Sequence, residues 1–283
     1  QMLTRIPRCE QVSISGDGRV LLCAGIEEVQ VWDTVERRLL GALKLGEGYC
    51  SATLAPSGKF LVTCSQQGLY RWPIVKQQKR SSNSWVIGPP ENLLLPLAGS
   101  PKTCSITADS RLLTVFCERG GSQLLVLDLE ETPRQARRIG FGPGDTSSDG
   151  RWTATAPWQG HHTKIWNAKT GELVQQIQGM NAQATFCPDQ SMLVVARAEE
   201  VDFYDSSWEL IDQLQRESGG GHRPAVAFSG DGKLLAYAHS SWEIRLLDAT
   251  TRKQLATLAA PNSEMVIQIA LNGDGSQLVA CTR

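Results

Sequence analysis

The sequence predicts an all-β fold built from one repeated unit, a four-stranded antiparallel sheet. Short runs of alternating apolar residues are separated by turns rich in Gly, Asp and Ser, which is typical of β-hairpins. One such turn recurs around residues 17, 57, 109, 149, 189, 231 and 274, so successive copies lie 40, 52, 40, 40, 42 and 43 residues apart. A second pattern, in which alternating apolar residues end at Trp-Asp or a related pair, follows each of the first six turns. Self-similarity at a fixed period indicates a repeat protein.

The segment from Phe228 to Leu258, FSGDGKLLAYAHSSWEIRLLDATTRKQLATL, shows the unit most clearly. Its strands are AVAF before the SGDGK turn, then LLAYA, IRLLD and QLATL. Asp and Gly suit tight turns because the Asp side chain bonds nearby backbone N–H groups and Gly accepts a positive φ. We therefore assign a set of recurring Asp residues to turn formation and not to a ring of metal ligands: Asp17, Asp149, Asp231 and Asp274.

The third strand of each unit carries a more specific pattern. It occurs as VQVWD, LYRWP, LLVLD, TKIWN, VDFYD and IRLLD, which end at Asp33, Pro73, Asp128, Asn167, Asp205 and Asp248. Together, the Asp-Gly turn and the strand ending in Trp-Asp resemble the WD40 repeat, and the resemblance covers essentially the whole chain. It implies a seven-bladed β-propeller, in which twisted four-stranded antiparallel sheets surround a central channel. The apolar patterns agree, because one sheet cannot bury both of its faces alone whereas a ring of stacked sheets can.

We expect residues 1–283 to form a single propeller domain whose blades start near residues 11, 50, 103, 145, 182, 224 and 265. The N-terminal QMLTRIP aligns with QLATLAAP at the end of the sixth copy, so residues 2–6 are expected to supply the outer strand that closes blade 7. Residues 265–283 supply only two strands of that blade. Its third strand is expected to follow Arg283 in a longer polypeptide, or to be disordered.

The repeats depart from the best-known WD40 pattern. That pattern has Gly-His before the first strand and Asp in the turn before the third, and these join Ser and Trp in a buried hydrogen-bond network. The Asp is absent from every copy, and Gly221-His222 alone resembles the Gly-His pair. We therefore expect few or no blades to hold the network. Degenerate repeats of this kind resemble the WD40 arrays of large bacterial signalling proteins, which implies a covalently attached serine/threonine kinase or other signalling domain.

Composition argues against several functional classes. The 28 Lys and Arg balance 29 Asp and Glu, for a formal net charge of −1, which does not favour nucleic acid. No run approaches the ~18 apolar residues of a membrane span, so no membrane association is predicted. The eight cysteines show no C-x-x-C spacing, so we predict buried thiols, no zinc site and a cytoplasmic location. The longest interval contains the basic run KQQKRSSNS at residues 76–84, which we expect to be a solvated loop; docking or a nucleic-acid contact is the alternative.

No catalytic motif is evident. The sequence lacks G-x-S-x-G, P-loop, H-E-x-x-H and EF-hand patterns. GFGPGD at residues 140–145 precedes a predicted strand, so we interpret it as a loop between blades and not as a dinucleotide fingerprint, which requires a helix there. The predicted first strands are mostly small or apolar and offer no ring of acids or His. We expect no enzymatic activity, no cofactor and no metal.

The remaining candidate site is the face formed by the loops between second and third strands and the loops between blades. The resemblance implies that partners dock there. Trp158 and Trp242 are the main candidates because large aromatics in exposed turns often anchor interfaces, although each ring could instead fold back over its own blade. The residues predicted to bind a partner are Glu27, Glu28, Gln66, Arg119, Trp158, His161, His162, Glu199, Glu200 and Trp242.

These observations favour a non-enzymatic scaffold or sensor module that binds a protein or peptide, within a larger signalling polypeptide. Two alternatives stay open. One is a propeller enzyme with a channel-centred site, such as a metal-dependent hydrolase or lactonase. The other is a purely structural spacer, which would have no preferred partner.

Overall fold

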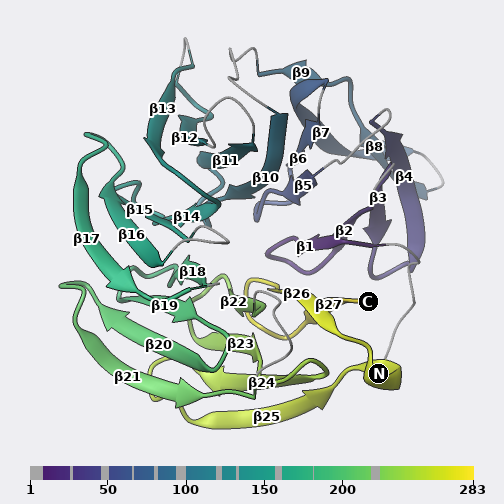
Figure 1. Ribbon diagram of the computed structural model, residues 1–283. Coiled ribbons are helices and arrows are strands. Elements are labelled where there is room, and N and C mark those ends of the chain that lie inside the picture. Colours follow the sequence, from purple (N-terminus) through teal and green to yellow (C-terminus); the bar gives the residue numbers. More distant parts are fainter. Residues whose placement is uncertain are drawn as a thin grey trace.

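The described residues form sheets arranged radially in a ring (Figure 1). The structure is a computed structural model. It describes residues 9–25, 28–45, 51–65, 67–79, 82–93, 100–118, 123–131, 134–156, 161–180, 182–217 and 224–283. Within each sheet the strands follow chain order, with the first strand nearest the centre of the ring and the last at its outside (Figure 1).

The first three blades are antiparallel sheets whose neighbouring strands pair in sequence order. Blade 1 contains β1 (Gln11–Ile14), β2 (Val20–Ala24), β3 (Glu28–Asp33) and β4 (Arg38–Lys44). Blade 2 contains β5 (Ser51–Leu54), β6 (Phe60–Ser65), β7 (Gly68–Lys79) and β8 (Ser82–Ile87), and β9 (Glu91–Asn92) also pairs with β7. Blade 3 contains β10 (Ser100–Ile106), β11 (Leu112–Glu118), β12 (Gln123–Asp128) and β13 (Ala136–Gly140).

Blades 4 to 6 repeat the same order. Blade 4 contains β14 (Gly144–Thr146), β15 (Trp152–Thr155), β16 (His162–Asn167) and β17 (Leu173–Gln178). Blade 5 contains β18 (Gln183–Phe186), β19 (Met192–Ala196), β20 (Glu200–Asp205) and β21 (Leu210–Gln215). Blade 6 contains β22 (Val226–Phe228), β23 (Leu234–Ala238), β24 (Glu243–Asp248) and β25 (Gln254–Ala259), followed by the short 3₁₀ helix η1 (Pro261–Ser263).

The predicted seven-bladed propeller, with a seventh blade lacking one strand, is wrong in blade number, because the described residues form six complete blades and a partial seventh sheet. That last sheet has two strands, β26 (Val266–Leu271) and β27 (Leu278–Thr282). The physical reason is that residues 265–283 contain one hairpin only, as their single turn implies. Residues 2–6, which were predicted to close blade 7, lie outside the described residues.

The hydrophobic core lies between neighbouring sheets. All six residues of β6 and all five of β19 are buried, whereas most of the outer strands β17 and β25 is exposed. Clusters of buried apolar side chains join blades 1 and 2, 2 and 3, 4 and 5, 5 and 6, and link the seventh sheet to both of its neighbours. A middle strand is buried on both sides because a sheet packs against each of its faces.

The recurring Asp residues act in turns, as predicted. In blade 6 the Ser229 hydroxyl donates a hydrogen bond to Asp231 at 2.7 Å, and the Asp231 carboxylate also accepts the backbone N–H of Lys233. The same arrangement recurs at Asp17, Asp109, Asp149 and Asp274, where Ser, Thr or Asn takes the place of Ser229. These bonds close the turn between the first and second strands of five sheets, those of blades 1, 3, 4 and 6 and the seventh sheet.

The innermost strands are linked across blades by side chains that bond to a neighbour's backbone. Gln268 accepts the backbone N–H of Val12 at 2.8 Å and so joins the seventh sheet to blade 1. Ser13 accepts the N–H of Leu54, and Asp145 accepts the N–H of Phe186, which joins blades 1 and 2 and blades 4 and 5. These bonds join the innermost strands of neighbouring sheets.

The WD40 hydrogen-bond network survives only as fragments. The Trp72 indole donates to Thr63 at 2.9 Å in blade 2, and the Trp166 indole donates to Thr155 at 2.9 Å in blade 4. The prediction that few blades hold the network is consistent with these two isolated pairs.

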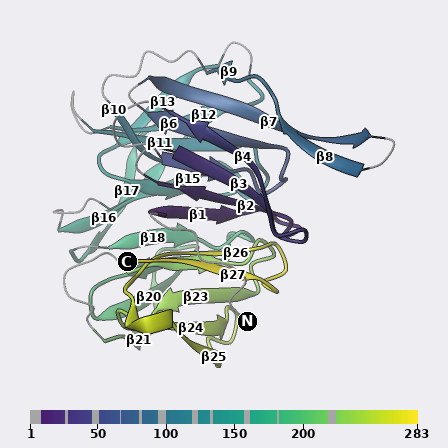
Figure 2. The same ribbon diagram turned by 90° about the vertical axis from the view of Figure 1, so that its right-hand side faces the viewer.

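The basic run at residues 76–84 is not the loop that the sequence predicted. It lies in a hairpin, because β7 and β8 extend beyond the rest of blade 2 and pair from Ile74–Ile87 to Lys79–Ser82. Figure 2, which views the ring edge-on, shows this hairpin projecting beyond one face of the ring.

Candidate docking face

Two kinds of loop lie on the same face of the ring. Because successive strands of each sheet are antiparallel, the loop between second and third strands and the loop leading to the next blade fall at the same end of the sheet. The turns between first and second and between third and fourth strands fall at the opposite end. We call the first of these ends the loop face.

The structure places the predicted residues unevenly on the loop face. His161, Glu199 and Trp242 lie in or beside the expected loops, and Glu28, His162 and Glu200 begin third strands there. Four further predicted residues lie outside the described residues: Glu27, Gln66, Arg119 and Trp158. The described residues therefore bring the predicted site together mainly at blades 4, 5 and 6.

Trp242 has an exposed side chain on a firmly held backbone. Trp242 is 52% exposed, so about half of its surface is open to solvent on the loop face. Its carbonyl accepts the N–H of Ala260 at 2.7 Å, and the neighbouring Ser241 carbonyl accepts the N–H of Val266 at 2.7 Å. The loop is thus bonded both to the end of its own blade and to the start of the seventh sheet. This arrangement presents an aromatic ring without the loss of loop entropy that binding would otherwise cost.

Arg216 connects the loops of blades 5 and 6 beneath this surface. The residue is buried, and its guanidinium donates to the carbonyls of Ala238, Arg197 and Ala198 at 2.9, 2.9 and 2.5 Å. Burial lowers the pKa of Arg216 from its ordinary value. The side chain serves as a fixed multiple donor, and it holds two loops in one position relative to each other.

A charged cluster supports the loop of blade 5. Arg197 forms ion pairs with Glu200 and with the buried Asp202, and Asp202 also accepts hydrogen bonds from Tyr204 and Gln213. Burial opposes the charge of Arg197, but the nearby Asp202 carboxylate and the Glu200 hydrogen bond raise its pKa overall. Glu200 is therefore a structural member of this cluster as well as a predicted contact residue, whereas Glu199 remains exposed.

His239 lies below the Trp242 loop and is buried. Its ring packs edge-on against Tyr237, with the ring centroids 6.2 Å apart, and its Nδ1 has no hydrogen-bond partner within the described part of the chain. Burial, and then the charge of Arg245, lower the pKa of His239. The neutral form is thus favoured in the folded protein.

Two exposed apolar residues of the loop face were missed by the sequence analysis. Phe141, between β13 and β14, is 61% exposed, and Met180, between β17 and β18, is 55% exposed. Phe141 lies in the GFGPGD segment, which the sequence analysis interpreted as a loop between blades without considering Phe141 as a contact residue. Its aromatic character in a loop between blades was the available signal. Together with Trp242, these residues place large apolar side chains on the loops of blades 3 to 6.

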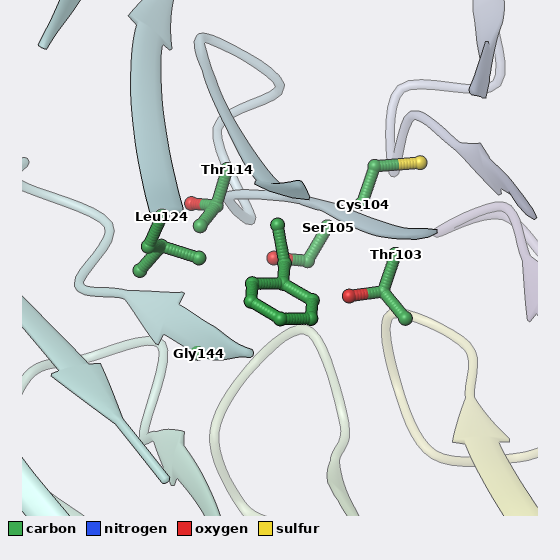
Figure 3. Close-up of a pocket in the computed structure, with 7 residues that line it drawn as sticks. Thr103, Cys104, Ser105, Thr114, Leu124 and Gly144 are labelled. Carbon is green, nitrogen blue, oxygen red and sulfur yellow. The ribbon is translucent and has the colours of Figure 1, made fainter. Parts of the chain in front are cut away.

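A small cavity lies elsewhere, between the inner parts of blades 3 and 4 (Figure 3). Its volume is about 90 Å³, and its lining includes Thr103, Ser105, Thr114 and Gly144. Small-molecule sites usually measure roughly 300–1,000 Å³, so this cavity is of a size for ordered water. Next to it, Thr114 donates to Thr146 at 2.8 Å, giving a polar contact between these two blades.

The described residues contain no group of three or more His, Cys, Asp or Glu arranged to hold a metal ion. None of their helices has the length and apolar character needed to cross a membrane.

Comparisons with known proteins agree with this architecture. Residues 184–274, which span blades 5 and 6, match the anaphase-promoting complex subunit 4 WD40 domain family. A hydrazine synthase structure from Kuenenia stuttgartiensis aligns with a TM-score of 0.67 at 13% identity, covering 100% of this chain and 97% of that chain, and this likeness concerns the fold alone. The search of curated proteins found no match. The match at residues 184–274 and the ring of four-stranded sheets support a WD40-repeat β-propeller family.

Proposed function

We propose that this propeller is a non-enzymatic protein-binding scaffold whose docking surface is the loop face of blades 4 to 6. The observation that carries the proposal is the group of exposed apolar side chains at Phe141, Met180 and Trp242, which lie on loops attached to a rigid ring. The WD40 fold fits an interaction scaffold, and WD40 propellers commonly bind protein partners.

Trp242 has the properties of a binding anchor. Truncating a central interface Trp typically costs at least about 2 kcal/mol, and a pre-formed loop retains more of that energy than a loop that must become ordered. Two hydrogen bonds supply this pre-organisation: the Ala260 N–H donates to the Trp242 carbonyl, and the Arg216 guanidinium donates to the Ala238 carbonyl. Phe141 and Met180 would add apolar contacts on either side of blade 4, and the thioether of Met adapts to irregular surfaces.

The charges around the anchor specify the chemistry of the partner. Glu199 and Glu217 are exposed on the loop face, whereas Arg197 and Arg245 are already paired with Glu200 and Glu243. The free charge of this region is therefore negative. We expect a protein segment that carries apolar side chains flanked by Lys or Arg.

We further propose that the propeller is part of a larger signalling polypeptide with a covalently attached kinase or other signalling domain. This proposal rests on the resemblance of its degenerate repeats to the WD40 arrays of large bacterial signalling proteins. The asymmetric loops support recognition of one irregular partner and not of a repeated ligand. A purely structural spacer would gain nothing from three exposed apolar anchors on one face.

The test is a pull-down from native cell extract with three variants of the protein. One carries Phe141→Ala, Met180→Ala and Trp242→Ala, the second carries Glu199→Lys and Glu217→Lys, and the control carries Val35→Ala. Val35 is 70% exposed in the β3–β4 turn, on the opposite face. Circular dichroism first establishes that each variant is folded.

The proposal predicts that specific proteins are recovered with the wild type and with Val35→Ala, and are lost with the triple variant. The charge-reversal variant should recover less of the same proteins. Equal recovery by the wild type and the triple variant would remove the loop face as the docking surface.

A further inference from the structure

Three cysteines that are distant in the sequence meet where the seventh sheet packs against blade 1. Cys23 lies on β2, Cys281 on β27, and Cys9 just before β1. Cys23 and Cys281 are buried in one small apolar cluster with Val12, and the half-buried Cys9 packs against it. No disulfide joins them, so the site contains free thiols.

Packing and hydrogen bonds bring these residues together. The Cys281 thiol donates to the Cys9 carbonyl at 2.6 Å, and the Cys9 thiol donates to the Gln11 carbonyl at 3.1 Å. Cys9, Cys23 and Cys281 share one apolar cluster. Cys281 therefore contacts Cys9 directly through the Cys9 backbone, within a cluster that holds all three side chains.

The pKa values of the three cysteines shift in different directions. The neighbouring Cys23 and Cys281 lower the pKa of Cys9 well below its ordinary value, and the same interactions raise the pKa of Cys23 and Cys281. Buried cysteines elsewhere behave differently from Cys9, because burial raises the pKa of Cys117 to about 11 and that of Cys187 to about 12. Cys9 is thus distinguished by a lowered pKa and by its partial exposure, which are features of reactive cysteines.

We propose that Cys9 and Cys281 are a thiol–disulfide exchange site that reacts with small-molecule disulfides such as oxidised glutathione. The Cys9 thiolate attacks one sulfur of the glutathione disulfide, which breaks its S–S bond, forms a Cys9–glutathione bond and releases one glutathione thiolate. The Cys281 thiol then gives its proton to the released glutathione thiolate and attacks the Cys9 sulfur. This step forms the Cys9–Cys281 bond and releases the second glutathione. Two protein thiols are oxidised and one glutathione disulfide is reduced to two thiols.

The bond would close the ring covalently. Cys9 and Cys281 are 272 residues apart, and the chain between them contains all six complete blades. A cross-link that closes so long a loop removes much of the entropy of the unfolded chain. Oxidation is therefore expected to raise the Tm by roughly 5–10 °C, and reduction to reverse the change.

The experiment treats the folded protein with oxidised glutathione and maps disulfides by mass spectrometry of non-reduced tryptic peptides. Trypsin places the three cysteines on different peptides, since Arg8, Arg19, Arg37 and Lys253 separate them. The proposal predicts a linked pair of peptides that contain Cys9 and Cys281, together with a higher Tm. Cys281→Ala should accumulate the Cys9–glutathione adduct, and Cys9→Ala should form neither product.

Two further variants keep the result specific. Cys187→Ala removes a buried thiol of blade 5 and should form the Cys9–Cys281 link as the wild type does. Cys23→Ala removes a group that lowers the pKa of Cys9, so it should form the same link more slowly. The proposal is overturned if Cys9 of the folded wild type remains unmodified, or if its disulfide joins Cys23. The mapping on the wild type decides the matter even where a variant fails to fold.

Discussion

Replacing Arg216 with Met should loosen the loop face and lower the stability of the whole ring. The substitution keeps an unbranched apolar stem but removes the donors that bond the carbonyls of Ala238, Arg197 and Ala198. Each of these bonds involves a charged donor, and leaving a buried carbonyl without a partner costs about 1–3 kcal/mol. Three bonds at the lower end of that range give about 3 kcal/mol.

A second effect offsets part of this loss of stability. Burial lowers the pKa of Arg216, which means that a charged guanidinium at this position costs free energy in the folded protein, and Met removes that cost. Allowing about 1 kcal/mol for this effect leaves a net destabilisation of about 2 kcal/mol. For a protein of this size the corresponding decrease in Tm is about 4–8 °C.

Differential scanning calorimetry measures this change, and Trp fluorescence reports on the Trp242 loop below the melting transition. The matched control is Arg151→Met, because the Arg151 side chain is 67% exposed and its contact with Asp149 is long, at 3.9 Å. The control should change the Tm by less than about 1 °C. A Tm for Arg216→Met that equals the wild-type value would refute the view that this residue holds the two loops together.

Three further predictions concern stability. Burial raises the pKa of Asp145 above its ordinary 3.8, so the stability that its protonated form contributes is full below pH 3.8 and is lost as the pH rises through the raised pKa. Asp145→Asn should therefore have a higher Tm than the wild type at pH 7, and the two Tm values should converge near pH 4. A difference in Tm that does not depend on pH would contradict this prediction. His239 has a pKa below its ordinary 6.5, so the stability that its neutral form contributes is full above pH 6.5 and is lost as the pH falls through the lowered pKa. Between pH 7.5 and pH 5, the Tm of the wild type should therefore fall further than the Tm of His239→Gln. Thr155→Val removes the acceptor of the Trp166 indole and should cost about 1 kcal/mol in urea unfolding; an unchanged midpoint would show that the bond contributes nothing.

The repeated sheets could be predicted from the sequence because their signals are local. The Ser229–Asp231 turn and the IRLLD strand each lie within a few residues, and the structure forms the expected hydrogen bonds there. The seventh blade is described only as a two-stranded sheet, and residues 2–6, which were predicted to add its outer strand, lie outside the described residues. The form of residues 76–84 was also wrong, since polar composition does not distinguish a loop from an extended hairpin.

The candidate site could be predicted only in part. The position of Trp242 in a turn follows from the repeat, but its exposure depends on bonds from Ala260 and Val266 that the sequence does not reveal. Phe141 and Met180 have no repeat signature, because loops between blades vary in length and composition. The meeting of Cys9 with Cys281 was likewise hidden, since ring closure alone brings together residues 272 positions apart.

The affinity of a purified partner for Trp242→Ala, measured by isothermal titration calorimetry, tests the docking face most directly. The partner is the protein recovered by the wild type, and Val35→Ala serves as the control on the opposite face. A Kd about 30-fold weaker for Trp242→Ala, with an unchanged Kd for Val35→Ala, is the expected result, since a loss of about 2 kcal/mol corresponds to that factor. Equal affinity of both variants and the wild type would contradict the account, because Trp242 would then lie outside the interface.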